Sequence, residues 1–316
     1  MRSGLWSGGV GANFNRSMAG CYVAFHKQLG DLVLLEPALS RLLAHHGRPV
    51  RLMTRNGHAD LVSLMPGVKF VKGLALAPAH SLYCFDPLNK SAFRSLIAPV
   101  LKRHHVRPAK IELHWYHPLV FSRPLNPELG DSYVAEFFWA NTPVPANGPF
   151  RPPVLSRPPD DWAPEEWKAG EFILVNPTSG WKKKMWTVDG WTEVIRSLGS
   201  RYRYVITSAQ AEWQLTHCQK ISAATGAVIQ PTTLRQFLWL CANAKAVLSV
   251  DGAASHLAAA FGVKCFTVFG PTVLVHWHRP APGHIAFQAP LNEDGVRSLR
   301  KLEPGPVIEA LAALGL

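Results

Sequence analysis

Several common signatures are missing from this chain of 316 residues. Its five cysteines are scattered and never form a CxxC pair, so we predict neither a disulfide framework nor a zinc site, and a reducing compartment fits. No apolar run approaches the roughly 18 residues that a membrane span needs. His114 and His117 form an HxxH pattern without a third ligand at suitable spacing. We therefore expect no bound metal.

Two familiar nucleotide-binding patterns are absent as well. The chain has no GxxxxGK[ST] pattern, which excludes a Walker loop, and no GxGxxG, which weighs against a dehydrogenase. Acidic residues are scarce relative to basic ones, with 21 Asp and Glu against 33 Lys and Arg and a net charge of +12. This excess favours an anionic partner: nucleic acid, a phosphorylated glycolipid or a membrane surface. No nucleic-acid-binding motif accompanies the charge.

The length and the distribution of proline predict two domains. The hydrophobic share of 47% is enough for two cores. Eight prolines crowd the span from Pro143 to Pro164, which predicts a semi-rigid linker. We therefore place a first domain at 20–142, the linker at 143–165 and a second domain at 166–316. Residues 1–19 lack an apolar signal-peptide core and are expected to form a disordered leader, with Met18 as an alternative start.

Apolar runs alternate with amphipathic segments in both predicted domains. This alternation predicts parallel sheets covered by helices, and hence the α/β class. In the first domain we expect strands at 21–25, 50–54, 82–85 and 111–113. Helices are expected from about residue 32 to 46 and at 133–141, and Pro37 should kink the first of these or mark its true first turn. The basic run 101–110 is either a solvated helix end or a phosphate-binding patch.

The second domain has a clearer series of elements. We expect strands at 172–176, 204–207, 227–229, 246–250 and 265–269. The expected helices are 188–198, 211–223, 234–242, a short one from residue 253, and one from 305 to 314. Proline near the start of the last helix suits its first turn.

The stretch from Leu248 to Thr272 is the most informative. An apolar strand ends at Asp251-Gly252, a small-residue helix runs from Ala253 to Gly262, and a second apolar strand follows. This is a βαβ unit, and ligands bind at the carboxyl ends of parallel strands. A helix beginning near Ala253 would direct unpaired N–H groups and its positive dipole end at a phosphate. The alternative is a plain βαβ unit in which Asp251 is an N-cap.

A second candidate site follows the strand 172–176. Thr178 and Ser179 offer hydroxyl groups there, and Lys182, Lys183 and Lys184 offer positive charge. A phosphate-binding loop needs both. An exposed lysine-rich loop would have the same composition. The loop therefore indicates a phosphate site only in combination with the stretch 251–256.

Asp31 is the third candidate. It follows Gly30 at the turn between the first strand and the first helix. A carboxylate at such a turn is most often an N-cap. It is also placed where the first domain of a two-domain enzyme would present a general base.

Taken together, the three stretches resemble one family. LGD before an apolar helix, NPTSxWxxKxW and DGAASHLAAAFGVKCFTVFGPT are similar to the bacterial ADP-heptose:lipopolysaccharide heptosyltransferases (glycosyltransferase family nine). The likeness runs from about residue 20 to the end and is thin between 75 and 150. It implies the GT-B fold, in which two Rossmann-like domains face each other across a cleft, with the donor bound mainly by the second and the acceptor by the first.

The resemblance also implies roles for single residues. Asp31 matches the candidate base, and Lys184 matches a catalytic and donor-binding lysine. Thr178 and Ser179 match the phosphate loop, and Asp251 matches the acid that contacts the donor sugar. The turn comprising Gly252, Ala253, Ala254, Ser255 and His256 matches the start of the pyrophosphate-binding helix. The family usually has Ser or Thr followed by glycine after the acid, whereas this chain has Gly252 and Ala253.

The expected activity is inverting, metal-independent transfer of a heptose from ADP-heptose to a lipopolysaccharide core acceptor, without a cofactor. The resemblance places such an enzyme in the cytoplasm, peripherally at the inner face of the cytoplasmic membrane, without a nucleic-acid partner. Two alternatives stay open: a GT-B enzyme that uses another nucleotide sugar, and a non-catalytic relative that binds an anionic glycolipid.

Overall fold

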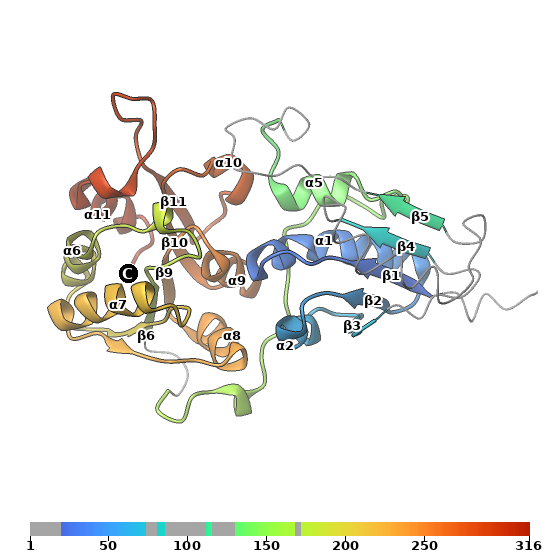
Figure 1. Cartoon of the computed structure of the whole chain (residues 1–316), viewed down its shortest axis with the longest axis horizontal. Helices are drawn as coiled ribbons and strands as arrows, with labels where there is room; N and C mark the ends of the chain where they lie inside the picture. The colour runs from blue at the N-terminus through green and yellow to red at the C-terminus, as the bar shows by residue number, and fades with distance from the viewer. Residues whose placement is uncertain (1–19, 74–80, 86–111, 116–129, 168–171) are drawn as a thin grey trace, which may run out of the picture.

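The computed structural model describes residues 20–73, 81–85, 112–115, 130–167 and 172–316. The expected leader 1–19, the basic run 101–110 and His117 lie outside these residues. Within the described ranges the chain forms two parallel sheets with helices packed on them (Figure 1). The predicted α/β class is confirmed.

The first sheet has the strand order β3-β2-β1-β4-β5, and every pair is parallel. Its strands are β1 Cys21–Ala24, β2 Val50–Met53, β3 Val68–Phe70, β4 Ser81–Cys84 and β5 Glu112–Trp115. The described helices of this domain are α1 Leu29–His46, α2 Ala59–Ser63 and α5 Val134–Ala140. The order reverses at β1, which places the switch point of the sheet beside the turn that leads into α1.

The second sheet has the order β11-β10-β9-β6-β7-β8 and is also parallel throughout. Its strands are β6 Phe172–Asn176, β7 Arg203–Ile206, β8 Val228–Ile229, β9 Ala246–Val250, β10 Lys264–Phe269 and β11 His284–Gln288. Its helices are α6 Val188–Leu198, α7 Glu212–Thr225, α8 Leu234–Asn243, α9 Ala253–Phe261, α10 Leu274–Trp277 and α11 Pro304–Ala312. The switch point lies between β6 and β9, so the loops that follow these two strands flank a predicted ligand position.

The helices and strands that were expected agree with the structure to within a few residues, but the start of the first helix and several further elements differ from the expectation. The first helix begins at Leu29, well before Pro37, so Pro37 does not mark its first turn. Asp31 therefore lies inside the first turn of α1, and Gln28 is the N-cap residue; the expectation that Asp31 could be the N-cap is wrong. Helix α2 and strand β3 in the first domain, and helix α10 and strand β11 in the second, were not predicted.

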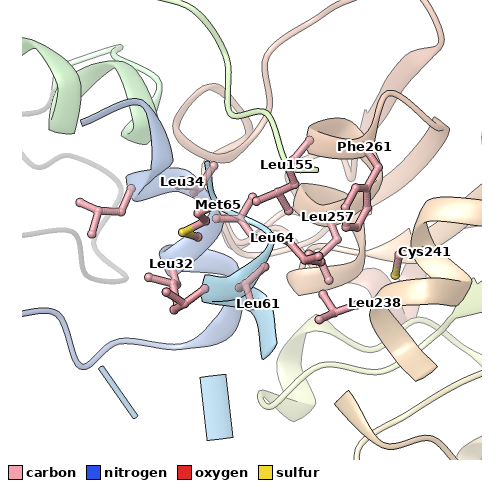
Figure 2. Close-up of a cluster of buried hydrophobic side chains, with 14 of the residues drawn as sticks. Leu32, Leu34, Leu61, Leu64, Met65, Leu155, Leu238, Cys241, Leu257 and Phe261 are labelled. Atoms are coloured by element: carbon pink, nitrogen blue, oxygen red, sulfur yellow. The ribbon is translucent and has the colours of Figure 1, made fainter. Parts of the chain in front are cut away.

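A continuous apolar cluster joins the two domains. Leu32 and Leu34 of α1 belong to the same buried cluster as Leu257 and Phe261 of α9, and Figure 2 shows Leu64, Met65 and Leu155 between the two pairs. Removing side chains of this kind from water is worth roughly 1.5–3 kcal/mol each. The cluster therefore holds α1 and α9 against each other at the junction between the sheets (Figure 1).

The proline-rich linker is fixed to both domains. The buried carboxylate of Glu36 in α1 accepts a hydrogen bond from Arg151 Nη2 at 2.8 Å and another from Arg151 Nη1 at 3.1 Å. On the other side, Leu155 N donates to Ala260 O of α9 at 3.1 Å. A bidentate arginine pair with a buried carboxylate gives a fixed geometry. The linker thus carries defined contacts rather than acting as a loose tether.

Among the described helices, none combines the length and the apolar run needed to cross a bilayer.

Candidate active site

Helices α1 and α9 begin close to each other, each at the carboxyl end of a strand. A Cβ placed on Gly30 would lie 2.9 Å from His256 Cδ2 and 3.4 Å from Ala253 Cα. A larger residue at position 30 would therefore require the buried ring of His256 to shift. The positive dipole ends of both helices are therefore directed at one region.

Lys184 and Asp251 meet at this region from different loops. Lys184 Nζ donates to Asp251 Oδ2 at 2.5 Å, and Thr272 Oγ1 donates to the same oxygen at 2.7 Å. The Asp251 side chain is 2% exposed and that of Lys184 is 17% exposed. The loops after β6, β9 and β10 thus converge on one buried carboxylate. Thr272 is a site residue that sequence reasoning missed, although it follows Gly270-Pro271 at the end of a predicted strand.

The three lysines of the loop 176–186 differ in their surroundings. Lys182 and Lys183 are exposed, whereas Lys184 is half-buried and lies 5.9 Å from the ring centre of Trp181 and 6.0 Å from that of Trp277. Aromatic faces and a carboxylate together stabilise an ammonium group that has lost part of its water. The structure therefore singles out Lys184, and Trp277 is a site residue that sequence reasoning missed.

Thr178 and Ser179, the hydroxyl residues of this loop, are held differently. Thr178 is buried, and its Oγ1 has no hydrogen-bond partner within the described part of the chain. Ser179 Oγ accepts from Trp181 N at 3.3 Å, and Ser179 O accepts from Gln214 Nε2 at 2.8 Å. A buried hydroxyl normally has a partner, because leaving one unsatisfied costs about 1–3 kcal/mol. Thr178 is thus the hydroxyl with unused hydrogen-bonding capacity.

Asp31 is half-buried in the first turn of α1, where its Oδ2 accepts a hydrogen bond from Gln28 N at 3.1 Å. Burial raises the pKa of Asp31 above its usual value, against the opposing effects of the Gln28 N–H, Lys27 and Lys184. The charge of Asp251 adds to the rise. Asp31 thus lies within electrostatic reach of both Lys184 and Asp251, and the structure brings together residues that are 153 and more positions apart in sequence.

The start of α9 carries no side-chain cap. Gly252 is its N-cap residue, and Ser255 Oγ donates back to Gly252 O at 2.8 Å. Ala253 and Ala254 contribute no polar side chain in its first turn. Burial lowers the pKa of His256 to about 4, so this imidazole is neutral at neutral pH and adds no positive charge. The N–H groups at the start of α9 are therefore offered to a ligand rather than to the protein's own side chains.

Within the residues that the structure describes, no three His, Cys, Asp or Glu side chains gather as a possible metal site. Of the HxxH pair, His114 lies in β5 and His117 lies outside the described residues.

Comparison with known proteins adds a family and a fold. Residues 149–299 match the sequence model of glycosyltransferase family 9 (heptosyltransferase). No curated protein matches the chain. Solved structures match over nearly the whole length, so the fold extends through the first domain as well.

Three of these structures illustrate the likeness. The heptosyltransferase WaaC of E. coli with ADP has a TM-score of 0.68 at 18% identity, covering 92% of this chain and 98% of that one. A family 9 glycosyltransferase from Veillonella parvula has a TM-score of 0.71 at 13% identity, covering 94% and 97%. The E. coli ADP-heptose lps heptosyltransferase II has a TM-score of 0.62 at 16% identity, covering 94% and 98%.

Residues 149–299 therefore form a domain of glycosyltransferase family 9, the heptosyltransferase family, and the chain is a glycosyltransferase whose two Rossmann-like domains have the GT-B arrangement.

Proposed function

We propose that this chain transfers a heptose from ADP-heptose to the core of a lipopolysaccharide acceptor. The observation that carries the proposal is the convergence of Asp31, Lys184 and the uncapped start of α9 on one region. A half-buried carboxylate, a cation and a row of N–H groups are what glycosyl transfer from a nucleotide diphosphate sugar needs. The solved structures with ADP and with ADP-2-deoxy-2-fluoro heptose support the choice of donor.

The reaction is a single displacement at the anomeric carbon, with inversion. The acceptor oxygen forms a bond to this carbon while the bond to the donor phosphate oxygen breaks, and ADP leaves with the electron pair. The proton of the acceptor hydroxyl passes to the Asp31 carboxylate. A base works best when its pKa approaches the working pH, and burial moves the pKa of Asp31 upward, in that direction.

The departing diphosphate carries the largest change of charge, so preorganised donors beside it contribute most. In this proposal Lys184, the N–H groups of Ala253 and Ala254, and the hydroxyl groups of Thr178 and Ser179 supply these donors without a metal or a cofactor. Lys184 has three N–H bonds and gives one to Asp251, so it can contact a phosphate as well. Asp251, held by Lys184 and Thr272, is placed to accept hydrogen bonds from the donor sugar.

The acceptor proposal rests on charge. A net charge of +12 suits a phosphorylated glycolipid at the inner face of the cytoplasmic membrane. Binding to vesicles that contain an anionic lipid should weaken as salt rises, because exposed charges are screened beyond about 8–10 Å at 0.1–0.15 M. Vesicle sedimentation at several salt concentrations measures this. Binding that does not depend on salt would contradict an electrostatic membrane contact.

The donor is tested by ligand protection. ADP-heptose and ADP should raise the unfolding temperature more than UDP-sugars, GDP-sugars, UDP or GDP at the same concentration, because a ligand that binds the native state stabilises it in proportion to its affinity. Equal protection by all three nucleotides would overturn the donor assignment.

One observation favours a second candidate, a GT-B enzyme with a different nucleotide sugar. Position 252 carries glycine, so the hydroxyl group that the family usually places there is missing. In the same assay, stronger protection by a UDP- or GDP-sugar would select this alternative.

A further inference from the structure

A cavity of about 530 Å³ lies along α9. It is enclosed by the linker segment 151–155, by the side of α9 that carries Ser255, His256, Ala259 and Ala260, by β10, and by the segment 277–281. This volume is within the range of small-molecule sites, roughly 300–1,000 Å³.

The cavity adjoins the proposed donor site but is not lined by its charged residues. Asp31, Thr178, Lys184 and Asp251 do not line it. It meets the site at Ser255, at the buried ring of His256 and at Trp277, whose ring also lies near Lys184. Along α9 its lining runs from Ser255 and His256 in the first turn to Gly262 at the C-cap. A ligand here would therefore contact α9 along its length.

Apolar side chains form most of the wall. Leu155, Phe261, Phe269 and Trp277 all line the cavity. His278 adds ring surface without charge, because burial lowers its pKa to about 4. Each CH₂ group that leaves water for such a surface gains roughly 0.8 kcal/mol. The wall therefore suits a hydrocarbon ligand.

The charged lining residues are all cationic. Arg151, Arg157 and Arg279 carry these charges, and no acidic residue lines the cavity among the described residues. Glu36 already neutralises Arg151. Arg157 donates to the uncharged carbonyl of Ala242 at 3.0 Å and so keeps its positive charge.

Arg279 is the cation best placed for a new partner. Its contact with Glu136 is long, at 3.4 Å, and the two side chains are 43% and 46% exposed. An exposed pair of this kind contributes at most about 1 kcal/mol. An anion that also fills the apolar cavity can therefore compete for the guanidinium group.

We propose that this cavity binds an anionic amphiphile: a single hydrocarbon chain lies between α9 and the linker, and its anionic head group contacts Arg279. Both properties of the lining are needed for this choice, since the apolar wall selects the chain and the arginines select the sign of the head group. Because the wall includes the linker, which is fixed to both domains, the ligand also bridges α9 and the linker.

Decanoate is a suitable probe, with 1-decanol as its uncharged counterpart and acetate as its chainless counterpart. Titration calorimetry on the full chain should detect binding of decanoate, weaker binding of decanol, and none of acetate. If acetate binds as well as decanoate, the site is an anion site and the proposal is wrong. If decanol binds as well as decanoate, the role of the arginines is wrong.

Two variants test the location. Ala259→Leu fills the cavity from α9 with a good helix former and should abolish or strongly weaken decanoate binding. Ala223→Leu makes the same change on the exposed side of α7 and should leave binding unchanged. If both variants bind like the wild type, decanoate is not in this cavity. Thermal unfolding shows whether each variant is folded.

Arg279→Gln should weaken decanoate about tenfold, the value expected for one charge-assisted hydrogen bond, and leave decanol unaffected. Val154→Asp supplies a second test that needs no change in the core, because Val154 lines the cavity and is 51% exposed. A carboxylate there should repel decanoate more than decanol. Unchanged decanoate affinity in both variants would overturn the proposal. None of these readouts depends on glycosyl transfer, so they can fail independently of the proposed function.

Discussion

Helices α1 and α9 both begin at the carboxyl end of a parallel strand, and their first turns approach each other (Figure 1). They differ in what occupies the positive end. In α1 the carboxylate of Asp31 lies in the first turn and accepts a hydrogen bond from Gln28 N. In α9 the N-cap residue is Gly252, and no side chain caps the helix.

The difference assigns a role to each helix start. A helix start that holds its own carboxylate can offer a base but has less capacity for a second anion. A start without a side-chain cap leaves its N–H groups for a ligand such as a diphosphate. The two domains thus supply complementary halves of one reaction, and substitutions at either helix should affect different steps.

Asp31→Asn should have the largest effect on rate. The change is nearly isosteric, and asparagine can still accept the hydrogen bond from Gln28 N, but it cannot take a proton. We expect turnover to fall by roughly 10²–10⁴-fold, with donor affinity unchanged. Steady-state kinetics and calorimetric titration of ADP measure the two quantities. A near-normal rate would leave Asp31 with a structural role only and would favour a non-catalytic or differently arranged site.

Lys184→Ala should weaken donor binding and turnover together, by roughly 10- to 100-fold, because one charge-assisted hydrogen bond to the diphosphate contributes about 1.5–3 kcal/mol. Lys182→Ala and Lys183→Ala are the matched controls, since both side chains are exposed. If all three variants behave alike, the loop is a diffuse basic surface. Thermal unfolding should accompany the assay, because Lys184→Ala also removes a partner of buried Asp251.

The contrast between the helices also predicts a pH dependence of stability. The pKa of Asp31 is raised in the folded state above 3.8, so the folded protein binds this proton more tightly than the unfolded chain does. Below pH 3.8 both states are protonated and the wild type resembles Asp31→Asn. As pH rises through the folded pKa, the wild type should lose stability relative to the variant. Unfolding temperatures of both proteins across this window test the sign, and a difference that does not change with pH would contradict it.

The local parts of this site could be predicted from sequence. Apolar runs that end at Gly or Pro predict the alternation of strands and helices. Residues 251–256 are contiguous and follow one of these runs, so their position at the start of a helix follows from this alternation. Thr178 and Lys184 follow a strand for the same reason. These predictions need only the geometry of one βα unit.

The contacts between distant segments could not be predicted. The approach of Gly30 to His256 depends on how one domain packs on the other, and so does the apolar cluster that joins α1 to α9. The hydrogen bond from Thr272 to Asp251 depends on the neighbouring positions of β9 and β10. The prediction that Asp31 could be the N-cap was wrong because the helix already begins at Leu29. Neither Leu29 nor Gly30 is a residue type that marks a helix start.

Gly252→Ser should have the smallest effect of these substitutions. It tests whether the start of α9, unlike that of α1, is left without a side-chain cap for the donor. It would give α9 the hydroxyl group that the related sequences usually carry. Gly252 has φ 178° and ψ −170°, an extended conformation open to any residue. An added Cβ would meet only Val250 O, at 3.8 Å. The serine should therefore fit without strain.

As an N-cap, serine should stabilise α9 by a few tenths of a kcal/mol relative to glycine, and a hydrogen bond to the donor should tighten binding by roughly two- to tenfold. Gly252→Ala is the matched control, because it adds the same Cβ without the hydroxyl group and should not tighten binding. Calorimetric titration with ADP-heptose compares the three proteins. Should serine and alanine both weaken binding, the bound donor occupies the space above Gly252. In that case glycine at position 252 would be required to make room for the donor of this chain, and its presence would not mean that a hydrogen bond to the donor has been lost.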